Sequence, residues 1–309
     1  YHQEVPRFEP SPCMVDLPLG FIEGQDVDCG YLVVPEEYAD LTGPKIKLGV
    51  AILRSQDHNP KPDPLYMLQG GPGGSTIETY LQAIPMNGRL WADRDIVLFD
   101  QRGTLYSRPG LDCPEFLDLM IETLDQDLTD EEDIRLSLET LQACRKRLAD
   151  EGIDLSAYDS VENAADVEAL RQALGYGEIN LYGVSYGSLL AQHVMRFSPE
   201  GLRSVILDAV VPPQVNFNLN APRTMNRSFE ELFSACAQDA DCDATYPNLR
   251  EVFYQQVDRL NESPTKIQLT DFETGQTYQA LMDGETFMGG IFLTPTVLSP
   301  GWRQSILGV

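Results

Sequence analysis

A single serine between two glycines carries the clearest chemical signal in this chain. Residues 183–187 read Gly-Val-Ser-Tyr-Gly, which places Ser185 in a G-x-S-x-G motif. A strand-like run, 178–182, precedes the motif and a helix-like run, 188–197, follows it. In this strand–turn–helix context the glycines permit a sharp turn that exposes the serine hydroxyl. The pattern predicts that Ser185 is a nucleophile, and a plain tight turn is the alternative.

A serine hydroxyl needs a base to remove its proton and a carboxylate to orient that base. The histidines are His2, His58 and His193, so none follows residue 193. His193 lies on the same predicted helix as Ser185 and is about 12 Å along its axis, because each helical residue rises by about 1.5 Å. His58 falls in a polar loop and His2 in a terminal segment. We expect none of them to be the base, and we expect the catalytic acid and histidine to lie outside this chain.

A second motif could stabilise negative charge. Residues 70–74 read Gly-Gly-Pro-Gly-Gly and directly follow an apolar run. A glycine-rich turn after a central strand can present backbone N–H groups to a developing oxyanion, together with the N–H of the residue after the nucleophile. This interpretation assigns the oxyanion hole to Gly71 and Tyr186. The lysine and the G-x-G-x-x-G spacing of phosphate-binding loops are absent from the motif, and a purely structural turn remains the alternative.

Together these motifs resemble the prolyl aminopeptidase and tripeptidyl aminopeptidase branch of the α/β-hydrolases. The glycine-rich loop, the Asp-Gln-Arg-Gly segment 100–103 and the serine motif occur in that order, and segments 163–175 and 29–36 are similar to the secreted tripeptidyl aminopeptidase-like members. The resemblance covers roughly residues 12–245. It implies Ser185 as nucleophile, Gly71 and Tyr186 as oxyanion donors, and a structural role for Arg102 near the site.

The chain departs from this family where the acid and histidine should follow. Asp208 ends the strand-like run 203–208, a position from which some hydrolases supply the acid. We weigh it as a candidate acid but favour a structural role at the start of the cap. Without a histidine, Asp208 could not activate Ser185.

The expected architecture is an α/β-hydrolase fold, a mostly parallel sheet with helices on both faces and a mainly helical cap inserted after the sixth strand. Residues 1–209 should form the N-terminal part of the core and 210–309 an incomplete cap. A helix over 161–174 should begin at the N-cap Ser160 and end before Gly175. The predicted strand and helix segments are 30–35, 46–54, 65–69, 95–100, 114–123, 130–149, 178–184, 203–208, 221–237 and 249–260, with a hairpin over 265–281 and a helix through 302–307.

The six cysteines indicate the cellular compartment in which the protein is located. Cys236 and Cys242 flank a short acidic loop, while Cys113 and Cys144 fall where an antiparallel pair of helices would bring them together. Cys13 and Cys29 then pair by default. Three disulfides are typical of an oxidising, extracytoplasmic compartment. We therefore expect a secreted or periplasmic protein whose signal peptide has already been removed. Zinc ligation and free cytosolic thiols are the alternatives, and the spacing does not favour zinc.

The net charge of −26 disfavours nucleic acid and anionic membrane surfaces as partners. No apolar run is long enough for a transmembrane helix, and no motif predicts a cofactor or metal. The expected partners are a peptide or small acyl substrate and a missing C-terminal fragment of the same protein. Carboxylates of the cap could bind the N-terminal ammonium group of a peptide substrate. Glu230 and Glu231 lie in the cap, but nothing in the sequence places them near Ser185.

The leading interpretation is a serine hydrolase, an exopeptidase that releases short peptides or single residues from peptide N-termini through an acyl-enzyme on Ser185. An esterase or lactonase acting on small acyl substrates is one alternative, since the fold does not fix the bond that is cleaved. A catalytically dead hydrolase scaffold used for binding is the other.

Overall fold

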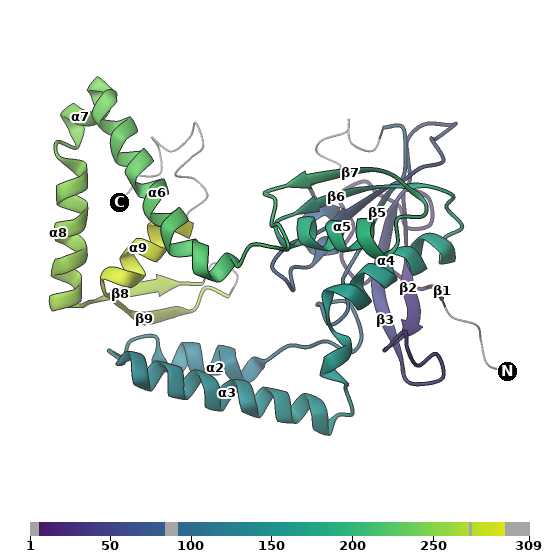
Figure 1. Cartoon of the computed structure of the whole chain (residues 1–309), viewed down its shortest axis with the longest axis horizontal. Coiled ribbons are helices and arrows are strands. Elements are labelled where there is room, and N and C mark those ends of the chain that lie inside the picture. Colours follow the sequence, from purple (N-terminus) through teal and green to yellow (C-terminus); the bar gives the residue numbers. More distant parts are fainter. Residues whose placement is uncertain (1–5, 84–91, 272–273, 294–309) are drawn as a thin grey trace. The chain divides into compact units, whose positions relative to one another are not determined.

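The structure is a computed structural model that describes residues 6–83, 92–271 and 274–293. The chain divides into two compact units, each assembled from two segments (Figure 1). The first unit comprises residues 1–113 and 145–215, and the second comprises 114–144 and 216–309. The predicted helix through 302–307 lies outside the described residues. No helix among the described residues has the length and apolar character needed to span a bilayer.

A seven-stranded sheet forms the frame of the first unit. Its strand order is β1-β2-β3-β5-β4-β6-β7. The pairs β5–β4, β4–β6 and β6–β7 are parallel, whereas β1–β2, β2–β3 and β3–β5 are antiparallel. The strands are β1 (Arg7–Pro10), β2 (Val27–Pro35), β3 (Lys45–Leu53), β4 (Leu65–Leu68), β5 (Ile96–Phe99), β6 (Ile179–Val184) and β7 (Leu202–Asp208).

Helices cover both faces of this sheet, which explains why β4 and β5 are hydrophobic runs along their whole length. Side chains alternate between the faces along a strand, so Tyr66 and Leu68 enter one hydrophobic cluster and Met67 enters the other. The first cluster is closed by α4 (Ser160–Ala173) and α5 (Tyr186–Phe197), the second by α1 (Thr76–Leu81). Strands that are covered on both sides read as continuous hydrophobic runs.

The boundaries of α4 correct one detail of the sequence interpretation. The N-cap is Asp159, not Ser160, because the Asp159 carboxylate accepts hydrogen bonds from the backbone N–H groups of Val161 and Glu162 at 2.8 and 2.9 Å. A carboxylate there also interacts favourably with the positive end of the helix dipole. Gly175 follows the helix with a φ of 74°, the left-handed conformation expected of a C-terminal glycine.

The second unit is mainly helical. It contains one antiparallel hairpin, β8–β9, in which Gly275 adopts a positive φ of 71° at the turn. Aromatic rings fill its core: the ring centroids of Phe229 and Phe253 lie 4.9 Å apart and those of Phe233 and Phe253 lie 5.3 Å apart. Its elements are α2 (Pro114–Thr123), α3 (Asp130–Asp150) as far as Cys144, α6 (Phe217–Gln238), α7 (Ala240–Thr245), α8 (Leu249–Glu262), β8 (Thr265–Thr270), β9 (Thr277–Met282) and α9 (Gly284–Leu293).

This division differs from the expected boundary between 209 and 210, because residues 114–144 belong to the second unit. Backbone and side-chain contacts explain the assignment. The N–H of Leu281 in β9 donates to the carbonyl of Leu124 at 2.8 Å, and Lys266 in β8 forms an ion pair with Asp125 at 2.8 Å. The α2–α3 segment is therefore tied to the hairpin. Sequence order alone gave no sign of this pairing.

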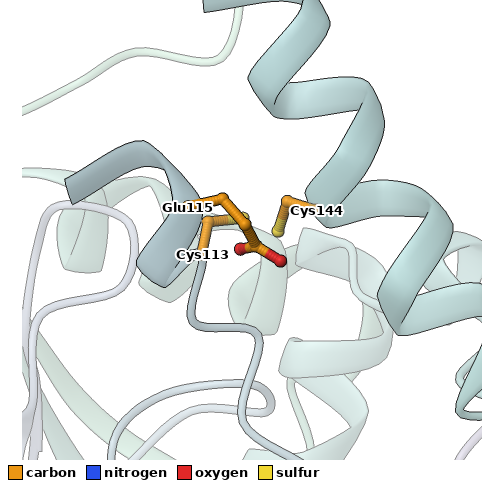
Figure 2. A group of neighbouring side chains, drawn as sticks. All are labelled: Cys113, Glu115 and Cys144. Atoms are coloured by element: carbon orange, nitrogen blue, oxygen red, sulfur yellow. The ribbon is translucent and has the colours of Figure 1, made fainter. Parts of the chain in front are cut away.

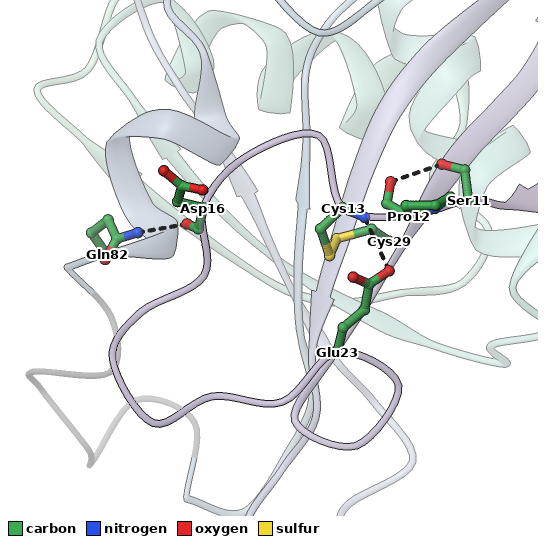
Figure 3. The surroundings of a disulfide bond; sticks show 7 residues. All are labelled: Ser11, Pro12, Cys13, Asp16, Glu23, Cys29 and Gln82. Atoms are coloured by element: carbon green, nitrogen blue, oxygen red, sulfur yellow. Dashed lines mark hydrogen bonds between the residues drawn. A yellow bond between two sulfur atoms is a disulfide. The ribbon is translucent and has the colours of Figure 1, made fainter.

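Disulfides join Cys13 to Cys29 and Cys236 to Cys242, the pairing expected from the sequence. Figure 3 shows the first bond, where the Cys13 N–H donates to the Glu23 carboxylate at 3.0 Å. Cys113 and Cys144 are also disulfide-bonded. Together with Glu115 they form a group whose spacing could suit a metal ion (Figure 2). Oxidised sulfurs are not the thiolates that such a site would need.

Candidate active site

Ser185 occupies a strained backbone conformation between β6 and α5. Its φ is 54° and its ψ is −121°, a combination that non-glycine residues adopt at a cost of about 1–3 kcal/mol. Hydrogen bonds hold the turn: the Ser185 N–H donates to the Asp208 carbonyl at 3.0 Å, and the Ser188 hydroxyl donates to the Ser185 carbonyl at 2.6 Å. The neighbouring strand and the following helix thus fix the position of Ser185.

The glycines on either side of Ser185 are required by close backbone packing. A Cβ on Gly187 would lie 1.9 Å from the Leu68 carbonyl oxygen, and a Cβ on Gly183 would lie 2.3 Å from the Gly187 carbonyl oxygen. Both obstacles are backbone atoms of buried strands and turns, so they cannot move aside cheaply. The G-x-S-x-G pattern reflects the packing of the elbow against β4 as well as its sharp turn.

Gly187→Ala should therefore lower the free energy of unfolding by more than about 3 kcal/mol. The matched control is Gly177→Ala, because a Cβ on Gly177 would meet no atom within 4 Å. Urea unfolding followed by circular dichroism measures both changes. A Gly187→Ala variant as stable as Gly177→Ala would contradict the close approach of the elbow to β4.

The glycine-rich loop lies directly against Ser185. A Cβ on Gly70 would come 2.7 Å from the Ser185 Cβ and 3.1 Å from its Oγ. The Gly70 N–H is occupied, since it donates to the Gln69 side-chain oxygen at 3.0 Å. The N–H groups of Gly71 and Tyr186 donate no hydrogen bond to any part of the described chain. Gly71 has a φ of 119° and Tyr186 begins α5. Their assignment as oxyanion donors stays a prediction.

No acid or histidine contacts the Ser185 hydroxyl among the residues that the structure describes. His193 packs on Phe197 in α5, with ring centroids 5.8 Å apart, and its Nδ1 is buried without a hydrogen-bond partner in the described chain. His58 is exposed in the loop that precedes β4, which enters the sheet at the end opposite the elbow. His2 lies outside the described residues.

Asp208 ends β7 and accepts a hydrogen bond from the Tyr182 hydroxyl. This bond, with burial second, raises the pKa of Tyr182 to about 12. The Asp208 carboxylate is exposed and is engaged with a strand neighbour rather than with a histidine. Whether Asp208 has a structural role or is the catalytic acid stays a prediction.

The raised pKa of Tyr182 makes the alkaline stability of the protein depend on Asp208. The unfolded phenol loses its proton near pH 10, whereas the folded one holds it to about pH 12. The folded state therefore binds more protons in this window, so the contribution is complete below pH 10 and is lost as the pH rises through 12. Asp208→Asn should make the free energy of unfolding fall less steeply over this pH range. The difference should be smaller than about 1 kcal/mol, since the pair is exposed. Urea midpoints at pH 9 and pH 11 test it, with Tyr182→Phe as control; an unchanged pH dependence would contradict the assignment.

Arg102 organises the loop that follows β5. Its side chain is fully buried and forms two hydrogen bonds of 2.8 Å to the Asp166 carboxylate in α4. Its remaining nitrogen donates to the carbonyls of Glu36 and Ala157. Burial raises the pKa of Asp166, and the charge of Arg102 opposes that shift. This network joins the ends of β2 and β5 to α4, as the structural role expected for Arg102 requires.

A cavity of about 720 Å³ opens beside the elbow in the first unit. Its walls come from the glycine-rich loop, the loop after β5, the start of α4 and Tyr186. The Tyr186 and Ser160 hydroxyls are hydrogen-bonded at 2.8 Å across this wall. The sequence did not predict this cavity, because its lining residues are spread over four separate segments.

The strand order, the strained serine and the glycine loop together define an α/β-hydrolase. The profile of the alpha/beta hydrolase fold family matches residues 63–281, and the chain belongs to that family. The serine protease Hip1 of Mycobacterium tuberculosis (strain ATCC 25618 / H37Rv) is 30% identical over 262 residues, which cover 81% of this chain and 49% of that protein.

One further curated protein and one solved structure are similar to this chain. The tripeptidyl aminopeptidase of Streptomyces lividans is 31% identical over 198 residues, covering 60% of this chain and 36% of that protein. The solved structure of proline iminopeptidase from Mycobacterium smegmatis is 16% identical, with a TM-score of 0.38, and the match covers 73% of this chain and 60% of that chain. The chain spans about half the length of the Hip1 proteins it matches.

Proposed function

We propose that this chain carries the nucleophile and oxyanion hole of a serine exopeptidase that cleaves peptides from their N-termini. The observation that carries the proposal is the geometry of Ser185: a strained, positive-φ serine whose Oγ faces the glycine-rich loop at Gly70. Backbone strain is maintained where function requires it. Relatives described as a serine protease and as a tripeptidyl aminopeptidase support a peptide substrate.

The proposed reaction proceeds through an acyl-enzyme. Ser185 Oγ attacks the scissile carbonyl carbon while a base takes its proton, and the N–H groups of Gly71 and Tyr186 donate to the oxyanion. The base gives this proton to the leaving nitrogen as the tetrahedral intermediate collapses, so the C–N bond breaks, the amine is released and the ester with Ser185 remains. Water then hydrolyses the ester and restores Ser185.

We further infer that an Asp–His pair comes from a part of the protein beyond this chain. The relatives are about twice as long as the matched region. In addition, β7 is the last strand of the sheet within the described residues, and its Ile206 is 51% exposed although it belongs to an otherwise well-covered sheet. Further strands added at this edge could bring the pair to Ser185. The disulfides support an extracytoplasmic location for the whole protein.

Reaction with a fluorophosphonate probe tests the proposal, because this reagent labels only an activated serine. The full-length protein should be labelled on Ser185, as identified by peptide mass spectrometry, and should hydrolyse tripeptide anilides that have a free N-terminus. N-acetylated anilides should be poor substrates. Rapid hydrolysis of short esters without peptidase activity would favour an esterase, and absence of labelling would favour a binding scaffold.

A further inference from the structure

Two buried side chains that directly follow β5 are hydrogen-bonded to the residues on either side of the glycine-rich loop. Before the loop, the Gln101 Nε2 donates to the backbone carbonyl of Gln69 at 2.9 Å. After the loop, the Asp100 carboxylate accepts from the Ser75 hydroxyl at 2.9 Å. Asp100 is 0% exposed and Gln101 is 3% exposed. The position of the loop therefore depends on side chains of a neighbouring segment as well as on its own turn.

The bond from Gln101 holds one end of a peptide group whose other end is also bonded. This peptide group carries the Gln69 carbonyl and the Gly70 N–H, and the N–H donates to the Gln69 Oε1 at 3.0 Å. The same Oε1 accepts from the Tyr80 hydroxyl at 3.3 Å, and the Gln69 Nε2 donates to the Thr79 hydroxyl at 3.1 Å, both in α1. Because a peptide group is planar, bonds at its C=O and its N–H together fix its orientation.

The next peptide group carries the N–H that the sequence assigns to the oxyanion hole. It joins Gly70 to Gly71, and its carbonyl accepts from the Gly74 N–H at 3.1 Å. The group is trans, so its N–H points away from its carbonyl oxygen. The Gly71 N–H donates no hydrogen bond within the described part of the chain. In these two consecutive peptide groups, every polar end is thus bonded except the Gly71 N–H.

The bonded loop packs closely against Ser185. A Cβ on Gly70 would lie 2.7 Å from the Ser185 Cβ. A change in the loop therefore changes the distance between the Gly71 N–H and any group bound to Ser185. An oxyanion donor is effective at about 2.7–3.1 Å from the oxyanion, and a misplacement of about 1 Å can slow a reaction about 100-fold.

We propose that Gln101 is a positioning residue of the active site. Its hydrogen bond to the Gln69 carbonyl sets the position of the glycine-rich loop, and through the loop it sets the position of the Gly71 N–H relative to Ser185. This inference rests on the proposed function, in which the Gly71 N–H donates to the oxyanion. It deepens that function, because it names a residue outside the loop on which this donor depends.

Gln101→Met in the full-length protein removes the donor at similar volume. The kcat for free tripeptide anilides should fall about 10- to 100-fold, whereas KM should stay the same, because the oxyanion exists only after the attack on the carbonyl carbon. The matched control is Gln82→Met. The Gln82 side chain also donates to a backbone carbonyl, that of Asp16 at 2.8 Å, but at the far end of α1 (Figure 3). A kcat equal to that of the control would overturn the proposal, and a raised KM at unchanged kcat would assign Gln101 to substrate binding instead.

A pair of inhibitors separates oxyanion stabilisation from a general disturbance of the site. A tripeptide aldehyde forms a tetrahedral hemiacetal with a nucleophilic serine, and the hemiacetal oxygen takes the place of the oxyanion. The corresponding tripeptide alcohol cannot form this adduct. Gln101→Met should weaken inhibition by the aldehyde at least about tenfold and leave inhibition by the alcohol unchanged. Gln69→Met, which removes the acceptor of the Gly70 N–H, should show the same selectivity. Equal weakening of both inhibitors would overturn the proposal.

Hydrogen exchange, read by mass spectrometry, follows the loop without any catalysis. The backbone amides of residues 69–75 should exchange faster in Gln101→Met than in Gln82→Met. Faster exchange in a protein whose Ser185 is not labelled by the fluorophosphonate would retain the effect of Gln101 on the loop and reject the hydrolase. Labelling of Ser185, with exchange and kcat both unchanged in Gln101→Met, would retain the hydrolase and reject the positioning role of Gln101.

Discussion

Replacing Ser185 with alanine should abolish fluorophosphonate labelling and lower kcat for free tripeptide anilides by roughly 10⁴- to 10⁶-fold, the range that loss of a serine nucleophile produces. The change removes the attacking oxygen but leaves the oxyanion donors at Gly71 and Tyr186 in place. KM should change little, since substrate binding does not depend on the Oγ atom. Steady-state kinetics of the full-length protein measures both values.

A second variant at the same position separates the loss of the hydroxyl group from the backbone strain at Ser185. Ser185 has a φ of 54°, which costs a non-glycine residue free energy that glycine does not lose. Ser185→Gly should therefore be equally inactive but more stable than Ser185→Ala by about 1 kcal/mol. Thermal unfolding of the two inactive proteins provides the comparison. A less stable glycine variant would show that the elbow is not strained as described.

Asp166→Asn should destabilise the first unit by about 3 kcal/mol, because it leaves the buried Arg102 guanidinium with only the more distant carboxylate of Glu162, 3.5 Å away. The side chains of both residues are fully buried, so water cannot replace the lost carboxylate. The loop after β5 should loosen together with the start of α4. Urea unfolding gives the free energy, and hydrogen exchange locates the loosened segments.

Two controls distinguish a buried charge from a simple loss of contacts. Arg102→Met combined with Asp166→Leu removes both charges and should recover part of the stability lost in Asp166→Asn, although the carbonyls of Glu36 and Ala157 lose a donor. Arg135→Met breaks an ion pair with Glu139 in which both side chains are more than half exposed, and it should have little effect. A double variant less stable than Asp166→Asn would contradict the buried-charge argument.

The elements of the sheet could be predicted from sequence because their signals are local. Continuous apolar runs identified β4 and β5, and the serine motif located the junction of β6 and α5. The first strand, β1, escaped detection because it has only four residues, ends in proline, and lies at the sheet edge. The fold class follows from the alternation of strands and helices, and the family match agrees with it.

The site was less accessible to sequence reasoning, because it depends on contacts between distant segments. That Gly70 contacts Ser185 follows from the parallel pairing of β4 with β6, which spacing does not reveal. The N-cap of α4 was wrong by one residue, since Asp and Ser are both good caps and only geometry decides between them.

The second unit is made of two pieces of chain separated by the whole of residues 145–215. During synthesis, the segment 114–144 leaves the ribosome 71 residues before the second segment of its unit begins at residue 216. At about 5–20 residues per second, this delay lasts roughly 4–14 s. Leu117, Met120 and Ile121 of α2 are at least 41% exposed even in the finished fold, so apolar side chains of this helix are uncovered both during the interval and after it. We expect the nascent chain to be a substrate for chaperones at this stage of its synthesis.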